Sequence, residues 1–389
     1  MRPAIDHRAP TGRQLTLAAG WLAAGALGLG PGRAHADGET IDFRWHYFSD
    51  NQGTDVSTTS FDVMKPFQAG SGRIALTYSL DMVSMPPIPG VPGSEEHLDA
   101  LTEASRPVSG TYQESEDYKK HRNQLEGAVG FGEVTGRFYT SIEEDWRAYQ
   151  AGASWQRMMA QENTILAVDA DFGWDHIMPL VEEGSASRDD HRTTISGVGT
   201  WQQTIDVKTQ SRVALELGTI HGYQSNPYRS VRTDSTIVAE SHPRERLRSA
   251  LSAEIIRYLS SRSSLRFGYR LYRDDWSLMS HTGSVEFKQA LGDVAVVRYR
   301  YRYYNQNGAY FYREDYADPE GVDGYLTADY KLAPLSSNLF GVKLEVPALD
   351  LLHLRRVFDA ADLVFKVERY YTSTDFSAGI IETGIQVGF

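Results

Sequence analysis

The feature that most constrains this chain is an alternation of apolar and polar residues with a period of two. The plainest stretch sets an aromatic face against a basic one: Tyr299, Tyr301 and Tyr303 alternate with Arg298, Arg300 and Arg302. Successive side chains of a β-strand point to opposite faces of its sheet, whereas a helix repeats about every 3.6 residues. The stretch is therefore predicted to be a strand whose two faces meet different environments.

The same alternation recurs along most of the chain after residue 37. It is clear in residues 73–81 and 265–271, where apolar side chains occupy every second position, and in residues 134–142 and 247–255, where they occupy most of these positions. Counted in this way, the pattern predicts roughly 16 to 18 strands, which is within the range of outer-membrane barrels. The fold class is therefore predicted to be all-β.

The last stretch, Gly379 to Phe389, indicates how such a sheet closes. The odd-numbered residues from Ile381 onward fall on one side, and the even-numbered residues from Glu382 onward fall on the other. A strand of this kind that ends in Phe resembles the closing strand of bacterial outer-membrane barrels. Phe389 is therefore predicted to be a signal that the barrel-assembly machinery reads. The alternative is an ordinary edge strand of a secreted, soluble β-sandwich.

The absence of a long apolar run decides how a membrane could be crossed. No run reaches the roughly 20 apolar residues that a transmembrane helix needs. A closed barrel is the other structure that satisfies every backbone donor and acceptor within lipid. Aromatic residues gather at strand ends such as 301–304 and 370–371, where interfacial girdles would lie. These features favour a transmembrane antiparallel β-barrel with outer-membrane lipid as its partner.

The N-terminus has the pattern of a secretory signal. Arg2, Arg8 and Arg13 precede an apolar run over residues 15–30, and Ala34-His35-Ala36 supplies the small residues of a cleavage site. Residues 1–36 are therefore predicted to be a signal peptide that is cleaved after Ala36. Residues 37–389 would then form the barrel in the outer membrane of a Gram-negative bacterium.

Charge and cysteine content exclude several function classes. The net charge is −12, and a nucleic-acid partner would instead require a basic surface. The chain contains no Cys, which removes disulfides, thiolate metal sites and cysteine nucleophiles. Nucleic acid is therefore not expected as a partner.

Three long polar stretches interrupt the strands, at residues 82–120, 171–192 and 221–245. If the chain starts and ends in the periplasm, all three fall outside the cell, provided that residues 309–315 form a strand. Residues 348–362 carry apolar side chains at helical spacing and are predicted to form a short periplasmic helix. These apolar positions are Leu351, Leu354, Val357, Phe358 and Ala361.

The polar face of the strands is predicted to line the lumen. The candidate lining residues are Arg246, Arg248, Arg266, Arg270, Arg298, Arg300, Arg302, Glu254 and Glu286, and Arg212 is expected on the same side. A ladder of arginines could concentrate anions in a water-filled pore. Alternatively, the charges pair across neighbouring strands and fill the lumen structurally. The sequence predicts a channel, a transporter or an envelope scaffold and leaves these possibilities open.

No catalytic motif is present. The chain lacks a Gly-x-Ser-x-Gly elbow, a His-Glu-x-x-His pair and a phosphate loop. No metal site and no cofactor are predicted. The remaining catalytic alternative is an outer-membrane hydrolase that uses His191, which lies beside Asp189 and Asp190, or His221 at the outer rim.

Several stretches resemble one bacterial family. They are residues 45–56 (WHYFSDNQGTDV), 222–229 (GYQSNPYR, with Asn226, Pro227, Tyr228 and Arg229), 303–312 (YYNQNGAYFY) and 370–389. The chain resembles the family called domain of unknown function 3570 (DUF3570) over most of its length. The resemblance implies an outer-membrane barrel with no assigned reaction. It also implies a link to an envelope redox system, because the family's genes lie beside flavin-transferase and thioredoxin-like genes. The proline-rich residues 82–93 depart from the family's pattern.

Overall fold

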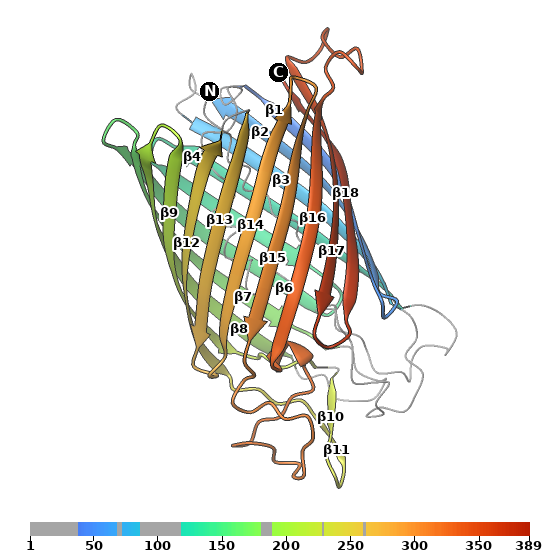
Figure 1. Ribbon diagram of the computed structural model, residues 1–389. Helices are drawn as coiled ribbons and strands as arrows, with labels where there is room; N and C mark the ends of the chain where they lie inside the picture. Colours follow the sequence, from blue (N-terminus) through green and yellow to red (C-terminus); the bar gives the residue numbers. More distant parts are fainter. Residues whose placement is uncertain (1–37, 68–71, 86–117, 180–188, 228, 260–261) are drawn as a thin grey trace.

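The strands of the computed structural model close into one antiparallel barrel. The structure describes residues 38–67, 72–85, 118–179, 189–227, 229–259 and 262–389. Sixteen strands in these residues form a continuous ring, because the first strand pairs with the last over Thr40–Asp50 and Ala378–Gly388 (Figure 1). The predicted all-β barrel is confirmed, and the closed ring rules out the β-sandwich.

The first eight barrel strands are β1 (Thr40–Asp50), β2 (Asp55–Phe67), β3 (Gly72–Met85), β4 (Tyr118–Phe131), β5 (Val134–Ile142), β6 (Trp146–Met159), β7 (Thr164–Ile177) and β8 (Asp190–Asp206). The remaining eight are β9 (Thr209–Gly222), β12 (Glu245–Leu259), β13 (Ser263–Asp274), β14 (Met279–Leu291), β15 (Ala295–Gln306), β16 (Leu335–Pro347), β17 (Ala360–Thr372) and β18 (Ser377–Gly388). A hairpin of β10 (Ser230–Arg232) and β11 (Ile237–Ala239) lies outside the ring.

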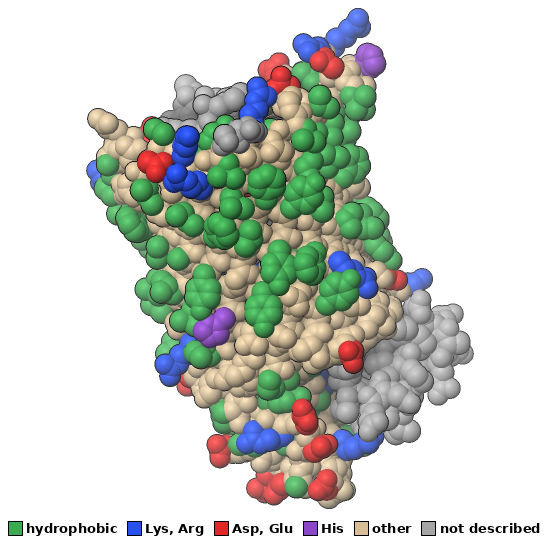
Figure 2. All heavy atoms as spheres, in the orientation of Figure 1, with side chains coloured by type: hydrophobic (Ala, Val, Ile, Leu, Met, Phe, Trp, Pro, Cys, Tyr) green, Lys and Arg blue, Asp and Glu red, His purple; other side chains and the backbone are tan. Residues whose placement is uncertain are grey.

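The outer face of the barrel is apolar and the inner face is polar. Phe267 and Tyr269 on β13 are 48% and 51% exposed, while Arg266 and Arg270, which flank them, point inward. Figure 2 shows hydrophobic side chains over the wall of the barrel, with charged side chains mostly toward its two ends. Because the sheet is closed, the apolar side chains on its outer face are not buried inside the protein. Half of each strand therefore faces outward, as the alternation predicted.

No helix in the described residues is long and apolar enough to cross a membrane.

The two ends of the barrel differ in their connections. Thr40 and Phe389 lie at one end, here called the terminal end, and the β10–β11 hairpin lies at the opposite one, the loop end (Figure 1). The connections within the three long stretches predicted from the sequence all lie at the loop end, together with residues 307–334. Much of the first, and part of the second, falls outside the described residues. The second predicted loop is too long, because residues 171–177 belong to β7 and residues 190–192 to β8.

Two predicted elements are wrong. Residues 348–359 form consecutive turns, and Ala360–Asp362 already belong to β17. His353 has φ +55°, a left-handed conformation that interrupts a right-handed helix despite the helical spacing of the apolar residues. Residues 309–315 are likewise not a strand, and the ring closes with an even number of strands without them.

The loop end carries a small hydrophobic core of its own. Phe311 is fully buried there and packs with Trp276, Leu278 and Leu332. Leu332 ends a short 3₁₀ helix, η4 (Tyr330–Leu332), in which Asp329 caps the first turn by accepting from the Lys331 backbone N–H at 3.0 Å. Residues 307–334 and 223–244 are called the roof below, because they cover the lumen at this end.

Candidate functional site

A cavity of about 450 Å³ lies inside the loop-end half of the barrel. Its wall includes inward-facing residues from β1 to β4 and from β8 onward around the ring, and the roof contributes Asp329 to Leu332. The Gln306 side chain of β15 donates to the carbonyls of Lys331 and Ala333 at 2.7 and 2.6 Å. This amide holds η4 against the barrel wall, so the roof forms a fixed part of the cavity.

Most of the predicted lumen residues line this cavity. They are Arg246, Arg248, Glu254, Arg270, Arg300 and Arg302. Arg212 also lines it, and three further basic residues that the candidate set did not include are Arg122, Arg192 and Lys331. The lining thus contains nine basic side chains but only two acidic ones, Glu254 and Asp329. The charge of the cavity wall is therefore strongly unbalanced.

The other three candidates lie nearer the terminal end. Arg298 pairs with Glu286 at 3.5 Å, and Arg266 lies opposite Glu286 in the register. None of the three is part of the cavity lining. Cross-strand charge pairs of this kind fill a lumen without requiring a ligand.

Carboxylates that are not part of the cavity lining neutralise several of its arginines. The pairs are Arg246 with Asp274 at 2.5 Å, Arg192 with Asp175 at 2.5 Å, Arg270 with Glu216 at 2.7 Å, Arg300 with Glu368 at 3.6 Å, and Arg122 with Asp81. Such pairs are charge-assisted and hold the guanidinium groups in place. These five arginines therefore have structural partners and contribute little net charge.

Arg302 differs from its neighbours. Its side chain makes no hydrogen bond or ion pair with any described residue, although it is enclosed by the barrel and lines the cavity. In the register, Arg302 lies between Ser284 on β14 and Leu339 on β16, so neither neighbour supplies a negative charge. Arg212, by comparison, lies directly opposite Glu254. Glu368, which pairs with Arg300 at 3.6 Å, acts on Arg302 electrostatically from farther away. Arg302 is therefore a positive charge of the cavity without an ion-pair partner among the described residues.

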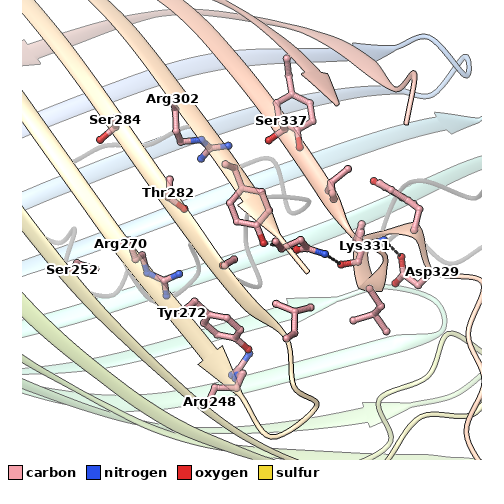
Figure 3. Close-up of a pocket in the computed structure, with 18 of the residues that line it drawn as sticks. Arg248, Ser252, Arg270, Tyr272, Thr282, Ser284, Arg302, Asp329, Lys331 and Ser337 are labelled. Carbon is pink, nitrogen blue, oxygen red and sulfur yellow. Dashed lines mark hydrogen bonds between the residues drawn. The ribbon is translucent and has the colours of Figure 1, made fainter. Parts of the chain in front are cut away.

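Hydroxyl groups lie between Arg302 and Arg270. Ser280, Thr282 and Ser284 follow one another on the inner face of β14, and Figure 3 shows Thr282 and Ser284 beside the two arginines. A Cβ at position 268 would lie 2.6 Å from the Ser284 Oγ, so Gly268 leaves room beside this hydroxyl. Guanidinium and hydroxyl donors together form an arrangement that can bind an oxyanion.

A buried charge cluster holds the roof together. Arg229 pairs with Asp329 at 3.0 Å and with Glu240 at 3.4 Å, and Thr327 donates to Glu240 at 2.5 Å. Burial opposes the charged form of both carboxyl groups, but the charge of Arg229 outweighs it and holds the pKa of Glu240 and of Asp329 below their usual values. His242 adds a contact to Glu240 at 3.2 Å. The cluster joins the two loops of the roof.

The cluster explains part of the predicted loop motif. Arg229 is its central cation, and the backbone N–H of Asn226 donates to Glu240 at 3.0 Å. Pro227 lies in the turn between them, and Tyr228 falls outside the described residues. Glu240 was not predicted from the sequence, because its partners come from separate loops and follow no period.

The predicted histidines lie outside the cavity. His191 on β8 is stacked on His176 and Trp174, with ring centroids 4.9 and 5.4 Å apart, on the outer face near the loop end. His221 on β9 is largely exposed and contacts Glu245 at 3.5 Å. In the part of the chain that the structure describes, no group of three or more His, Asp or Glu side chains is placed to share a metal ion.

Phe389 lies at the terminal end. Its ring packs edge-on against Phe358, with centroids 4.8 Å apart, and its backbone N–H donates to the carbonyl of Glu39 at 2.9 Å. These contacts join the two ends of the ring. The role of Phe389 in assembly stays a prediction, as does the signal peptide, which falls outside the described residues.

Together, these observations define the class of protein. A closed antiparallel ring with an apolar outer belt and a charged lumen satisfies its backbone groups internally and presents hydrocarbon-compatible side chains to its surroundings. The chain is therefore an outer-membrane β-barrel. In such barrels, long loops lie outside the cell and short turns face the periplasm, so the loop end is extracellular.

The particular family follows from the sequence match. The chain belongs to the family described as "Protein of unknown function (DUF3570)", whose profile matches residues 15–360. This confirms the resemblance. A search of curated proteins finds no match.

Solved structures of outer-membrane proteins are similar in fold. The siderophore receptor PirA from Acinetobacter baumannii is 9% identical with a TM-score of 0.44, and the match covers 86% of this chain and 53% of the receptor. The chain thus spans about half the length of this receptor. OccAB2 from Acinetobacter baumannii is 8% identical with a TM-score of 0.39, covering 90% of this chain and 98% of that one. A loop-deletion mutant of OmpT from Vibrio cholerae is 10% identical with a TM-score of 0.43. This match covers 90% of this chain and 98% of the OmpT chain.

Proposed function

We propose that this barrel is a channel or transporter for small anions, which bind in the arginine-lined cavity on their way through the lumen. The observation that carries this proposal is Arg302, an enclosed guanidinium group without an ion-pair partner among the described residues. An unpaired charge in such a setting is costly unless a ligand or water satisfies it. An anion from solution supplies the missing partner.

The surrounding charge supports the same conclusion. Once the five paired arginines and Arg248, which has an interaction of its own, are set aside, Arg212, Arg302 and Lys331 remain in the lining. They are opposed by Glu254 and by Asp329, and Asp329 already pairs with Arg229. A wall with one dominant sign of charge raises the local concentration of counter-ions and favours their passage.

The scaffold interpretation accounts for only part of this pattern. It explains the ion pairs of the lumen, but it gives no reason for a cavity with a surplus of positive charge. No observation favours the hydrolase, because His191 and His221 lie on the outer face. The link to an envelope redox system stays a prediction.

Planar bilayer recordings test this function. With a KCl gradient across the bilayer, the wild-type barrel is expected to give a reversal potential of the sign that chloride selectivity requires. Arg302→Gln should reduce this selectivity. Arg257→Gln, the same substitution at an exposed ion pair with Asp206 near the terminal end, should leave it unchanged. A folded barrel that conducts no anions, or that prefers potassium, would contradict the proposal.

A further inference from the structure

The wall that faces most of the arginines carries a cluster of apolar side chains. Four adjacent strands, β18, β1, β2 and β3, contribute Ile380, Phe48, Val56 and Val83 to the cavity lining, and β1 and β2 also contribute His46 and Thr58. Most of the basic and hydroxyl-bearing residues come from the adjacent strands β9, β12, β13, β14 and β15, while Arg122 and Arg192 lie on β4 and β8. Since these two groups of strands lie in different arcs of the closed ring, the cavity has an apolar side and a basic side.

This division distinguishes between kinds of anion. An inorganic ion or a very short carboxylate gains nothing from apolar residues, and it binds best where all surrounding groups donate hydrogen bonds. A polar lumen would be expected to continue around the ring, because inner faces of outer-membrane barrels are polar. The apolar side chains of Phe48, Val56 and Val83 depart from that pattern within the cavity.

We propose that the solute of this cavity is an amphipathic organic anion, with one oxyanion head at Arg302 and an apolar body against β18, β1, β2 and β3. This inference rests on the proposed anion transport and narrows its substrate class. The volume of about 450 Å³ falls within the range of roughly 300–1,000 Å³ that small organic ligands occupy.

The head is held by Arg302 and the hydroxyls beside it. A guanidinium group has five N–H donors in a planar fork that matches a carboxylate, and no described protein group accepts from those of Arg302. Ser284 and Thr282 on the neighbouring strand supply further donors (Figure 3). Arg270 pairs with Glu216 at 2.7 Å, so it is held in place and contributes little net charge to the site.

The body is held by burial of apolar surface. Val83 and Ile380 are almost fully buried by the protein itself, so they form a firm surface, while Val56 and Phe48 are only partly covered. A phenyl-sized group that leaves water gains roughly one to two orders of magnitude in its binding constant. Neither the head nor the body alone would use both sides of the cavity.

Three probes of related shape separate the two contributions. Phenylacetate has the charge and the apolar body, acetate has the charge alone, and 2-phenylacetamide has the body without the charge. Their binding would be measured by titration calorimetry on the full barrel in lipid nanodiscs, with empty nanodiscs as the blank. Phenylacetate is expected to bind at least about tenfold more tightly than either of the other two.

Two variants assign these contributions to the two sides. Arg302→Gln should reduce phenylacetate binding to the level of the amide, whereas Arg257→Gln at the terminal end should not change it. Val56→Thr keeps the shape of the side chain but adds a hydroxyl to the apolar side, and it should weaken phenylacetate about threefold to tenfold while acetate binding is unchanged. Val63→Thr, on the opposite face of the same strand, is the matched control.

The outcomes distinguish this inference from the function on which it rests. If acetate and phenylacetate bind equally, and both bind better than the amide, the amphipathic solute is wrong while anion binding stands. If the amide binds as well as phenylacetate, both are wrong. A barrel that binds none of the three probes also overturns the inference.

Discussion

The two halves of the lumen use the same residue types in different ways. Near the terminal end, basic and acidic side chains pair closely, as Lys366 does with Glu382 at 2.6 Å and Lys343 with Glu345 at 2.9 Å. In the loop-end half, carboxylates outside the cavity lining pair with five of its arginines, and Arg302 forms no ion pair with a described residue. The comparison shows that the register of charges across strands, rather than their number, separates structural filling from a binding site.

The largest effect is expected in the roof, where the charges are most deeply buried. Arg229→Met would leave Glu240 and Asp329 without their shared cation, and breaking a buried charge pair in this way costs about 3–5 kcal/mol. The roof should therefore unfold locally while the barrel stays closed. Hydrogen exchange of residues 229–244 measures this, with β14 as the internal reference. Unchanged protection of these residues would show that the cluster does not hold the roof.

The paired half of the lumen should lose stability when a partner is removed. Lys366→Met leaves Glu382 and Glu368 less compensated, and the free energy of unfolding should fall by about 3 kcal/mol, because Arg44 still contacts Glu382 at 3.3 Å. Urea unfolding in lipid vesicles measures the change. Lys65→Met, at an exposed pair with Glu39, is the control and should cost under about 1 kcal/mol. Equal losses in the two variants would contradict the distinction between enclosed and exposed pairs.

The roof should also respond to acid. Because the pKa values of Glu240 and Asp329 are lower in the folded roof than in an unfolded one, these groups stabilise the roof above about pH 4, and this contribution is lost as the pH falls through the folded values. A spin label at Glu320→Cys should become more mobile between about pH 5 and pH 2. A label at Val207→Cys, in the turn between β8 and β9 at the other end, should not. Mobility that rises equally at both positions would point to general unfolding instead.

The smallest effect on stability is expected at the unpaired arginine. Arg302→Gln breaks no ion pair with a described residue and leaves no carboxylate exposed, so the free energy of unfolding should change by less than about 1 kcal/mol. It should nevertheless remove the anion preference. The same urea unfolding series as for Lys366→Met gives the comparison directly. A loss as large as that of Lys366→Met would mean that Arg302 has a structural role.

The sequence predicts the fold and which side chains point into the lumen or outward, because a strand's period of two is a local property. Tyr299 to Arg302 fall on the correct faces for this reason. It does not predict which arginine is paired, since Arg300 meets Glu286 and Arg302 meets Ser284 only through the register of β14 with β15. The row of hydroxyls at 280, 282 and 284 was a readable signal, because it alternates on the inner face between two arginine-bearing strands.

Irregular regions were predicted less well. The apolar spacing of residues 348–362 is helical, but the left-handed backbone at His353 turns the chain instead. The roof depends on contacts between Arg229, Glu240 and Asp329, which lie in separate loops and have no periodic relation in the sequence. Their positions follow from tertiary packing around Phe311 rather than from local pattern.

The most direct test of an unpaired positive charge in the cavity is an anomalous diffraction measurement on crystals of the barrel grown with bromide. A bromide peak is predicted inside the cavity beside Arg302 and Ser284, and it should be absent from crystals of Arg302→Gln. Bromide sites confined to the outer surface or to the turns, with none in the cavity of the wild-type barrel, would contradict the account.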